Sequence, residues 1–95
     1  MDEAQRDLER LRAALDDCNA ELCAALARRA ALVREVAALK ARAGLAPLDP
    51  AREEHMLQAV RSAAHKDSFD PAALERIFRA ILAESRALVL RPPAE

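Results

Sequence analysis

The sequence predicts an all-α fold with three helices, of which the first is much the longest. Composition supports this fold class, because the 95 residues include 24 Ala, 14 Leu and 13 Arg but only one Gly and no Trp or Tyr. Helix breakers are widely spaced, and no Gly or Pro interrupts residues 4–43. The dipeptides Asp49-Pro50 and Asp70-Pro71 each join an N-cap residue to a proline at the first helical position, so they mark two further helix starts.

These signals place the helices at about residues 4–43, 50–66 and 71–90. Gly44 stands where the first helix should have its C-cap, and Pro92 and Pro93 end the third helix. We therefore expect residues 1–95 to form a single helical domain, too short for a dinucleotide-binding unit with a second domain.

Apolar side chains repeat with helical spacing along the last two helices. The inner face of the second helix is predicted to carry Met56, Leu57, Val60 and Ala64. That of the third is predicted to carry Leu74, Ile77, Phe78, Ile81, Leu82, Leu88 and Val89.

Charge, cysteine and histidine patterns exclude several classes of partner and cofactor. The net charge of -1 lacks the basic excess that drives binding to phosphate backbones, so no nucleic acid is expected. An acidic start and no 18-residue apolar run predict no leader and no membrane segment, hence a cytoplasmic protein. Cys18 and Cys23 point about 140° apart on one helix, cannot bridge, and are expected to be small buried side chains. His55 and His65 share no helix face, so no metal site is predicted.

The length of the first helix predicts a homodimer. About 40 helical residues span about 60 Å, whereas a compact monomer of this size has a radius of gyration of about 12 Å. The two shorter helices cannot cover the apolar stripe of such a rod. We expect the long helices of two copies to pair and cover it.

Arg29 occupies a core position of the first helix, between Leu22 and Val36 in the seven-residue repeat. A buried guanidinium without a partner costs several kcal/mol, and this stripe offers no carboxylate of its own. An acid from another helix or an anionic ligand is therefore expected beside it.

Other polar residues interrupt the inner faces of the shorter helices. Taken singly, Glu53 is a first-turn acid that complements the helix dipole, and Ser85 is a core hydroxyl with its hydrogen bond satisfied. Together with Arg29, Lys40 and Arg52, these two residues predict a polar cavity inside a helical bundle. The cations favour a small polyanion as its ligand.

The order and spacing of these residues closely resemble the all-helical, type II chorismate mutases, over about residues 8–89. The matching residues are, in order, Leu11-Arg12, Leu26-Ala27-Arg28-Arg29, Lys40, Pro47-Leu48-Asp49-Pro50-Ala51-Arg52-Glu53-Glu54, Ile77-Phe78 and Ser85. The resemblance implies an intertwined dimer with two active sites, each built mainly from one chain. It also implies conversion of chorismate to prephenate in aromatic amino-acid biosynthesis, an intramolecular rearrangement that needs no cofactor and no metal.

The resemblance implies that Arg29 and the partner's Arg12 clamp the substrate's carboxylates, with Ser85 helping to hold one of them. The helix geometry agrees, because Arg12 and Arg29 are seventeen residues apart, about 25 Å along the axis. One small ligand cannot touch both from a single chain.

At the other end of the substrate, the resemblance implies that Lys40 donates to the ether oxygen and the ring hydroxyl. Glu53 would accept a hydrogen bond from that hydroxyl, while Asp49 and Arg52 would shape the same end of the pocket. Catalysis would then consist of holding the dianion in a folded conformation and stabilising charge on the ether oxygen.

Val89 departs from the family pattern, which has Gln or Glu there as a second donor to the ether oxygen. A valine cannot donate, and losing one such donor typically costs about 10²- to 10³-fold in rate, so the chain alone is expected to be a weak catalyst. Three compensations are open. Lys40 alone could carry the step, Arg86 or Arg91 could swing in, or a partner enzyme of the shikimate pathway could reorganise the C-terminus.

Two other functions compete with the mutase hypothesis. Relatives that eliminate pyruvate from isochorismate, or that rearrange aminodeoxychorismate, share the scaffold. A non-catalytic helical dimerisation or regulatory module, as a fragment of a larger enzyme, would explain the long helix and Val89. It would not explain why Arg29, Lys40, Glu53 and Ser85 all lie on predicted inner faces.

Overall fold

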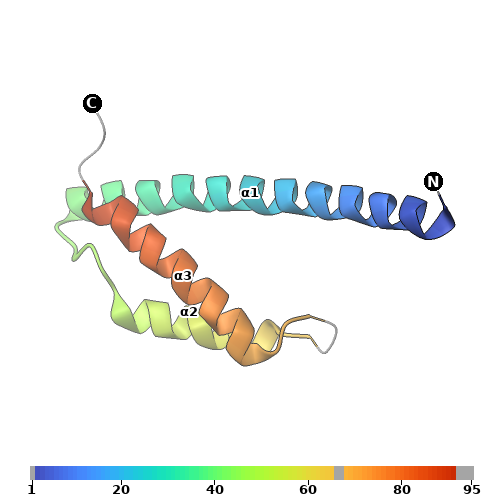
Figure 1. Ribbon diagram of the computed structural model, residues 1–95. Helices are drawn as coiled ribbons and strands as arrows, with labels where there is room; N and C mark the ends of the chain where they lie inside the picture. Colours follow the sequence, from blue (N-terminus) through green and yellow to red (C-terminus); the bar gives the residue numbers. More distant parts are fainter. Residues whose placement is uncertain (1, 66–67, 92–95) are drawn as a thin grey trace. The chain divides into compact units, whose positions relative to one another are not determined.

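The computed structural model describes residues 2–65 and 68–91, and in these residues every regular element is an α-helix (Figure 1). Helix α1 covers Glu3–Ala43, α2 covers Pro50–Ala63 and α3 covers Pro71–Leu90. The predicted all-α class is confirmed, and so are the bounds of the third helix. No helix in these described residues is long and apolar enough to cross a membrane.

Local hydrogen bonds set both ends of α1. At its start, the Asp2 carboxylate accepts from the backbone N–H of Gln5 at 2.8 Å, a cap that the sequence analysis did not predict. At its end, Gly44 adopts a φ of 70°, and Leu45 N–H donates to the Lys40 carbonyl at 2.9 Å. This is a Schellman cap, so the predicted role of Gly44 is confirmed.

The two shorter helices begin at the predicted N-caps. The Asp49 carboxylate accepts from the backbone N–H of Arg52 at 3.0 Å, and the Asp70 carboxylate accepts from that of Ala73 at 2.8 Å. In both helices, proline occupies the first helical turn. Because proline lacks an N–H, it leaves no donor unsatisfied at this position.

Helix α2 ends earlier than predicted. From the sequence, we expect it to end at about residue 66, but the last helical residue is Ala63, and Ala64 has extended backbone angles of φ −65° and ψ 134°. The chain must reverse direction between α2 and α3. Residues after Ala63 that helix propensity alone would assign to α2 therefore belong to the connection. Lys66 lies outside the described residues.

The chain divides into two compact units, one ending at Leu32 and the other beginning at Val33. The boundary falls within α1. From Glu3 onward, the first unit therefore consists of α1 alone. The second unit contains the last turns of α1 together with α2 and α3.

Within the second unit, α2 packs antiparallel against α3. Glu53 near the start of α2 bonds to Arg86 near the end of α3, and Arg61 near the end of α2 bonds to Glu75 near the start of α3. Leu57 lies between these two ion pairs and is 2% exposed.

The predicted inner faces of the second unit are largely confirmed. Leu57 and Leu82 are buried, at 2% and 6% exposure, and Ile77 is the one predicted member that is exposed. The other predicted members are half-buried, namely Met56, Val60, Ala64, Leu74, Phe78, Ile81, Leu88 and Val89.

Helix α1 exposes its apolar stripe. Eight large apolar side chains along it are 44–61% exposed, namely Leu8, Leu11, Leu15, Leu22, Leu26, Leu32, Val36 and Leu39. Cys18 and Cys23 are also exposed, so the prediction that they are buried is wrong for the single chain. They belong to the same stripe-bearing helix, on which no residue is buried.

Candidate active site

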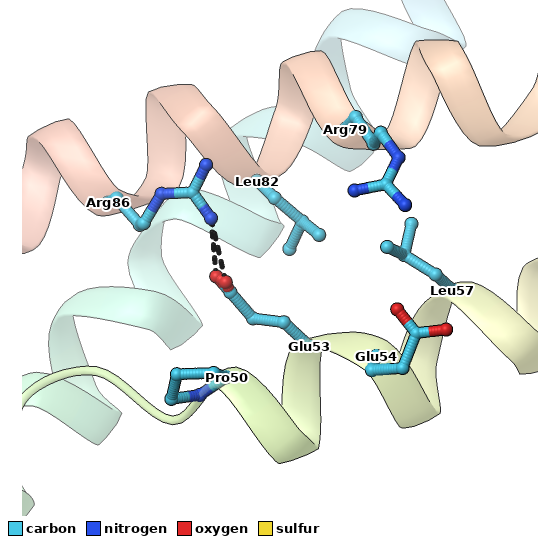
Figure 2. A pocket seen from close by; sticks show the side chains of 7 residues that line it. All are labelled: Pro50, Glu53, Glu54, Leu57, Arg79, Leu82 and Arg86. Carbon is cyan, nitrogen blue, oxygen red and sulfur yellow. Dashed lines mark hydrogen bonds and ion pairs between the residues drawn. The ribbon is translucent and has the colours of Figure 1, made fainter.

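A cavity of about 300 Å³ lies between α2 and α3, within the second unit (Figure 2). Its volume is at the lower end of the range for small-molecule sites. The residues that line it are Pro50, Glu53, Glu54 and Leu57 from α2, and Arg79, Leu82 and Arg86 from α3.

Helix periodicity explains why both apolar and charged side chains line this cavity. On α3, Arg79, Leu82 and Arg86 are separated by three and four residues, so they share one face. In Figure 2, Leu57 and Leu82 lie between the two helices, and Glu53 and Arg86 point toward one another. The cavity thus combines an apolar wall with two carboxylates and two guanidinium groups.

The shortest described contact in the cavity joins Arg86 to Glu53. Arg86 Nη1 donates to Glu53 Oε1 at 2.5 Å and to Oε2 at 2.7 Å, a charge-assisted pair. The Glu53 side chain is 23% exposed and that of Arg86 is 44% exposed. This pair links residues 33 positions apart in the sequence, so it depends on the packing of α2 against α3.

A second charged network lies beside the cavity and joins the same two helices. Arg61 donates to Glu75 and also, at 3.1 Å, to Glu54, while Arg79 Nε donates to Glu75 at 2.8 Å. Hydrogen bonds from Arg79 and then Arg61 lower the pKa of the Glu75 carboxyl below 4.5. The bond to Glu75, followed by that to Glu54, raises the pKa of Arg61.

Asp49 and Arg52 do not line the cavity. Asp49 caps α2, and its exposed side chain binds the backbone N–H of Arg52. The side chain of Arg52 is exposed and lies 3.4 Å from the His55 ring nitrogen Nδ1. The prediction that Arg52 is buried in a polar cavity is therefore wrong for this chain, because position 52 lies on the outer face of α2.

Ser85 and Val89 lie on α3 and are half-buried. The Ser85 hydroxyl donates to the Ile81 carbonyl at 2.7 Å, one turn earlier in the helix. This contact agrees with the interpretation of Ser85 as a hydroxyl whose hydrogen bond is satisfied. Val89 follows Arg86 by three residues, about one helical turn.

The residues that line the cavity do not include the predicted cations Arg12, Arg29 and Lys40. Lys40 is half-buried in the last turn of α1, in the second unit, whereas Arg12 and Arg29 belong to the first unit. Arg29 is half-buried and Arg12 is exposed, and no polar side chain is buried in residues 2–65 and 68–91. In the single chain Arg29 is only half-buried, because the stripe around it is itself exposed.

Histidine, cysteine and carboxylate side chains do not gather into a candidate metal centre anywhere in the described part of the chain. The charged groups of the cavity are hydrogen-bond donors and acceptors, which suits them to binding a polar organic molecule.

Comparison with known protein families relates this architecture to one enzyme family. The family model described as chorismate mutase type II matches residues 11–89, which is most of the chain. The chain belongs to this family. Among solved structures, it is similar to a form II chorismate mutase from Thermus thermophilus, with 30% sequence identity and a TM-score of 0.85. That similarity covers 93% of this chain and 99% of the other. Comparison with curated proteins gives no significant match.

Membership of the chorismate mutase family confirms the function implied by the sequence resemblance. The enzyme is an isomerase that rearranges chorismate to prephenate, a step of aromatic amino-acid biosynthesis. Neither match favours the sister reactions or a non-catalytic module.

One feature of this chorismate mutase that sequence analysis did not predict is the contact between Arg86 and Glu53. From the sequence, Arg86 was expected only as one of several groups able to compensate for Val89. A usable signal was present, because Arg86 follows the buried Leu82 by four residues and so shares its helix face.

Proposed function

We propose that this chorismate mutase is a homodimer with two active sites, each centred on the cavity that Glu53 lines. In each site, Arg29 and Lys40 of one chain and the partner's Arg12 bind the chorismate dianion. The observation that carries this proposal is the cavity itself, which has the volume of a small-molecule site and holds Glu53, the carboxylate that the family resemblance assigns to the substrate hydroxyl.

The charge of the cavity supports recruitment of further cations. Glu53 and Glu54 carry two negative charges, and Arg79 and Arg86 carry two positive charges, so the lining is neutral overall. A dianion binds weakly to a neutral lining, since desolvation of two carboxylates must be offset by opposite charges. Lys40 and the two clamping arginines supply that positive charge.

The exposed stripe of α1 supports the dimer. Monomeric proteins rarely expose large continuous apolar patches, and this one runs from Leu8 to Leu39. Pairing of two α1 helices would cover it and bury Cys18, which shares the row of Leu11 and Leu32. Arg12 would then contact the site of the partner, because it is about 25 Å from Arg29 on its own helix.

Catalysis in the proposed site needs no nucleophile, because the rearrangement is pericyclic. Arg29, the partner's Arg12 and Ser85 would hold the carboxylates so that the side chain folds over the ring. The Ser85 hydroxyl would turn from the Ile81 carbonyl toward the carboxylate. Lys40 would donate to the ether oxygen, where negative charge develops, and Glu53 would accept from the ring hydroxyl. Asp49 and Arg52 would shape that end of the site through the first turn of α2.

The proposal extends to the surroundings of the enzyme. We place it in the cytoplasm and expect a second enzyme of the shikimate pathway as a binding partner that orders the end of α3, where Val89 departs from the family pattern. Adding such an enzyme to the purified chain should raise kcat. An unchanged kcat, with binding demonstrated by sedimentation, would remove this part of the proposal.

The test of the site compares two cations in the last turn of α1. Lys40→Met should lower kcat by at least about 10²-fold, with prephenate identified by NMR as the product of the wild type. Stability should stay the same or rise. Arg42→Met is the matched control, because Arg42 is exposed and should leave kcat unchanged. Wild-type turnover by Lys40→Met would overturn the proposed site.

A mixing experiment tests the shared site. Inactive Arg12→Ala and inactive Lys40→Ala chains, after exchange of subunits, should together recover about a quarter of wild-type activity, because each heterodimer holds one intact site. Sedimentation equilibrium should show a dimer at micromolar concentration. Heterodimers that form without any recovery of activity would show that Arg12 does not act across the interface.

A further inference from the structure

The position of Arg86 bears directly on the donor that this chain lacks at Val89. Arg86 and Val89 are three residues apart on α3, so both lie on the same side of that helix. Arg86 lines the cavity, and its guanidinium reaches Glu53 on the facing helix (Figure 2). Arg86 starts about one turn earlier on α3 than position 89 and has a longer side chain than Gln. Its guanidinium can therefore reach the site that a Gln at position 89 would serve.

The hydrogen bonds of Arg86 leave donors available for a ligand. Nη1 binds both oxygens of Glu53, at 2.5 and 2.7 Å. Within residues 2–65 and 68–91, Nε and Nη2 of Arg86 have no hydrogen-bond partner. A guanidinium carries five N–H groups in a rigid plane, so binding Glu53 through one nitrogen also orients the others.

The chemistry of chorismate connects Glu53 to the ether oxygen. The ring hydroxyl and the ether oxygen are attached to neighbouring ring carbons, so a group bonded to the acceptor of the hydroxyl lies close to the ether oxygen as well. We propose that Arg86 is a further catalytic residue, which keeps Nη1 on Glu53 and donates from its remaining N–H groups to the ether oxygen. This inference rests on the proposed function of Glu53.

The other candidate arginines fit this role less well. Arg79 also lines the cavity, but its Nε is bonded to Glu75 in the neighbouring network. Arg91 follows the last residue of α3 and does not line the cavity. Arg86 alone among the three contacts Glu53.

The first experiment removes the donor. Arg86→Met should lower kcat by about 10²- to 10³-fold, with a smaller change in KM, because the contact strengthens as charge develops on the ether oxygen. Arg86→Lys should retain part of the activity. Arg76→Met is the matched control, since Arg76 is exposed on α3 and does not line the cavity. Arg91→Met should also leave kcat unchanged. An Arg86→Met enzyme with wild-type kcat would overturn the inference.

The second experiment moves the donor to the family's position. In the wild type, Val89→Gln should change kcat by less than about threefold, because Arg86 already serves the ether oxygen. In the Arg86→Met background, the same change should raise kcat by at least about tenfold. A large gain in the wild type, or no gain in the Arg86→Met background, would contradict a shared role. A purely structural role for Arg86 predicts no such rescue.

The experiments distinguish failure of the proposed active site from failure of the proposed role of Arg86. If Lys40→Met keeps wild-type turnover, the proposed site is wrong whatever Arg86 does. If Lys40→Met is inactive and Arg86→Met is fully active, the site stands and only the role of Arg86 is refuted. Circular dichroism and thermal unfolding of each variant exclude loss of the fold as the cause.

Discussion

Replacing Leu57 with alanine removes the most buried side chain in the described part of the chain, at 2% exposure. Glu53 lies one turn before it on α2 and Arg61 one turn after it, and both form ion pairs with α3. Leu57 therefore fills the apolar contact between the two charged links. Its truncation tests whether this contact holds α2 and α3 together.

The expected loss of stability is about 2–3 kcal/mol, the lower part of the range for Leu to Ala in a core. The lower part applies because Leu57 and Leu82 already border a cavity of about 300 Å³, so the new space joins an existing one. For a chain of this size, 1 kcal/mol corresponds to about 4–8 °C, so Tm should fall by about 10–20 °C. The cavity loses part of its apolar wall, and KM for chorismate should rise.

Thermal and urea unfolding, followed by circular dichroism at a fixed protomer concentration, measure this loss. Leu90→Ala is the matched control, because Leu90 is at the end of α3 and is 61% exposed, so its truncation should change stability by less than about 0.5 kcal/mol. Equal effects of the two substitutions would refute the conclusion that Leu57 and Leu82 form the core of the α2–α3 unit.

Three further predictions concern caps and charges. Gly44→Ala should destabilise the protein by about 1 kcal/mol in urea unfolding, because Gly44 has a φ of 70°; nothing lies within 4 Å of the added Cβ, so the cost is conformational. Asp70→Ala should cost about 1 kcal/mol through loss of the bond to Ala73 N–H, whereas Asp70→Asn should retain most of it, as thermal unfolding will show. Glu75→Gln should flatten the pH dependence of Tm: the pKa of Glu75 is lowered in the folded state, so its contribution is present above about pH 4.5 and is lost as the pH falls through the folded-state pKa. The Tm values of wild type and variant should therefore differ at neutral pH and converge as the pH falls below the folded-state pKa of Glu75, and a constant difference would contradict this sign.

The starts of α2 and α3 and the end of α1 could be predicted because they depend on neighbouring residues. Asp49, Asp70 and Gly44 act within one helical turn of their positions, through a side-chain acceptor or a positive φ. The end of α2 could not be predicted in the same way. No Gly or Pro directly follows Ala63, and the helix stops there because the chain must reverse before α3.

The candidate site was predicted in part. Glu53 faces the cavity, as the inner-face pattern indicated, but its role in binding stays a prediction. Arg52 was expected in the same cavity and lies on the outer face, because adjacent residues on a helix point about 100° apart. Cys18 and Cys23 were expected to be buried and are exposed, and Arg29 is only half-buried, because no residue of α1 is buried in the single chain.

The sequence by itself determined the all-α class and the starts of α2 and α3, since periodicity and caps are local properties, and the order of its polar residues indicated the family. Only the tertiary structure decided which charges meet. Arg86 and Glu53 are 33 residues apart, and their contact exists because antiparallel packing around Leu57 and Leu82 brings the end of α3 to the start of α2. Helix spacing shows that Arg86 shares a face with Leu82, but the partner it meets depends on how α2 and α3 align.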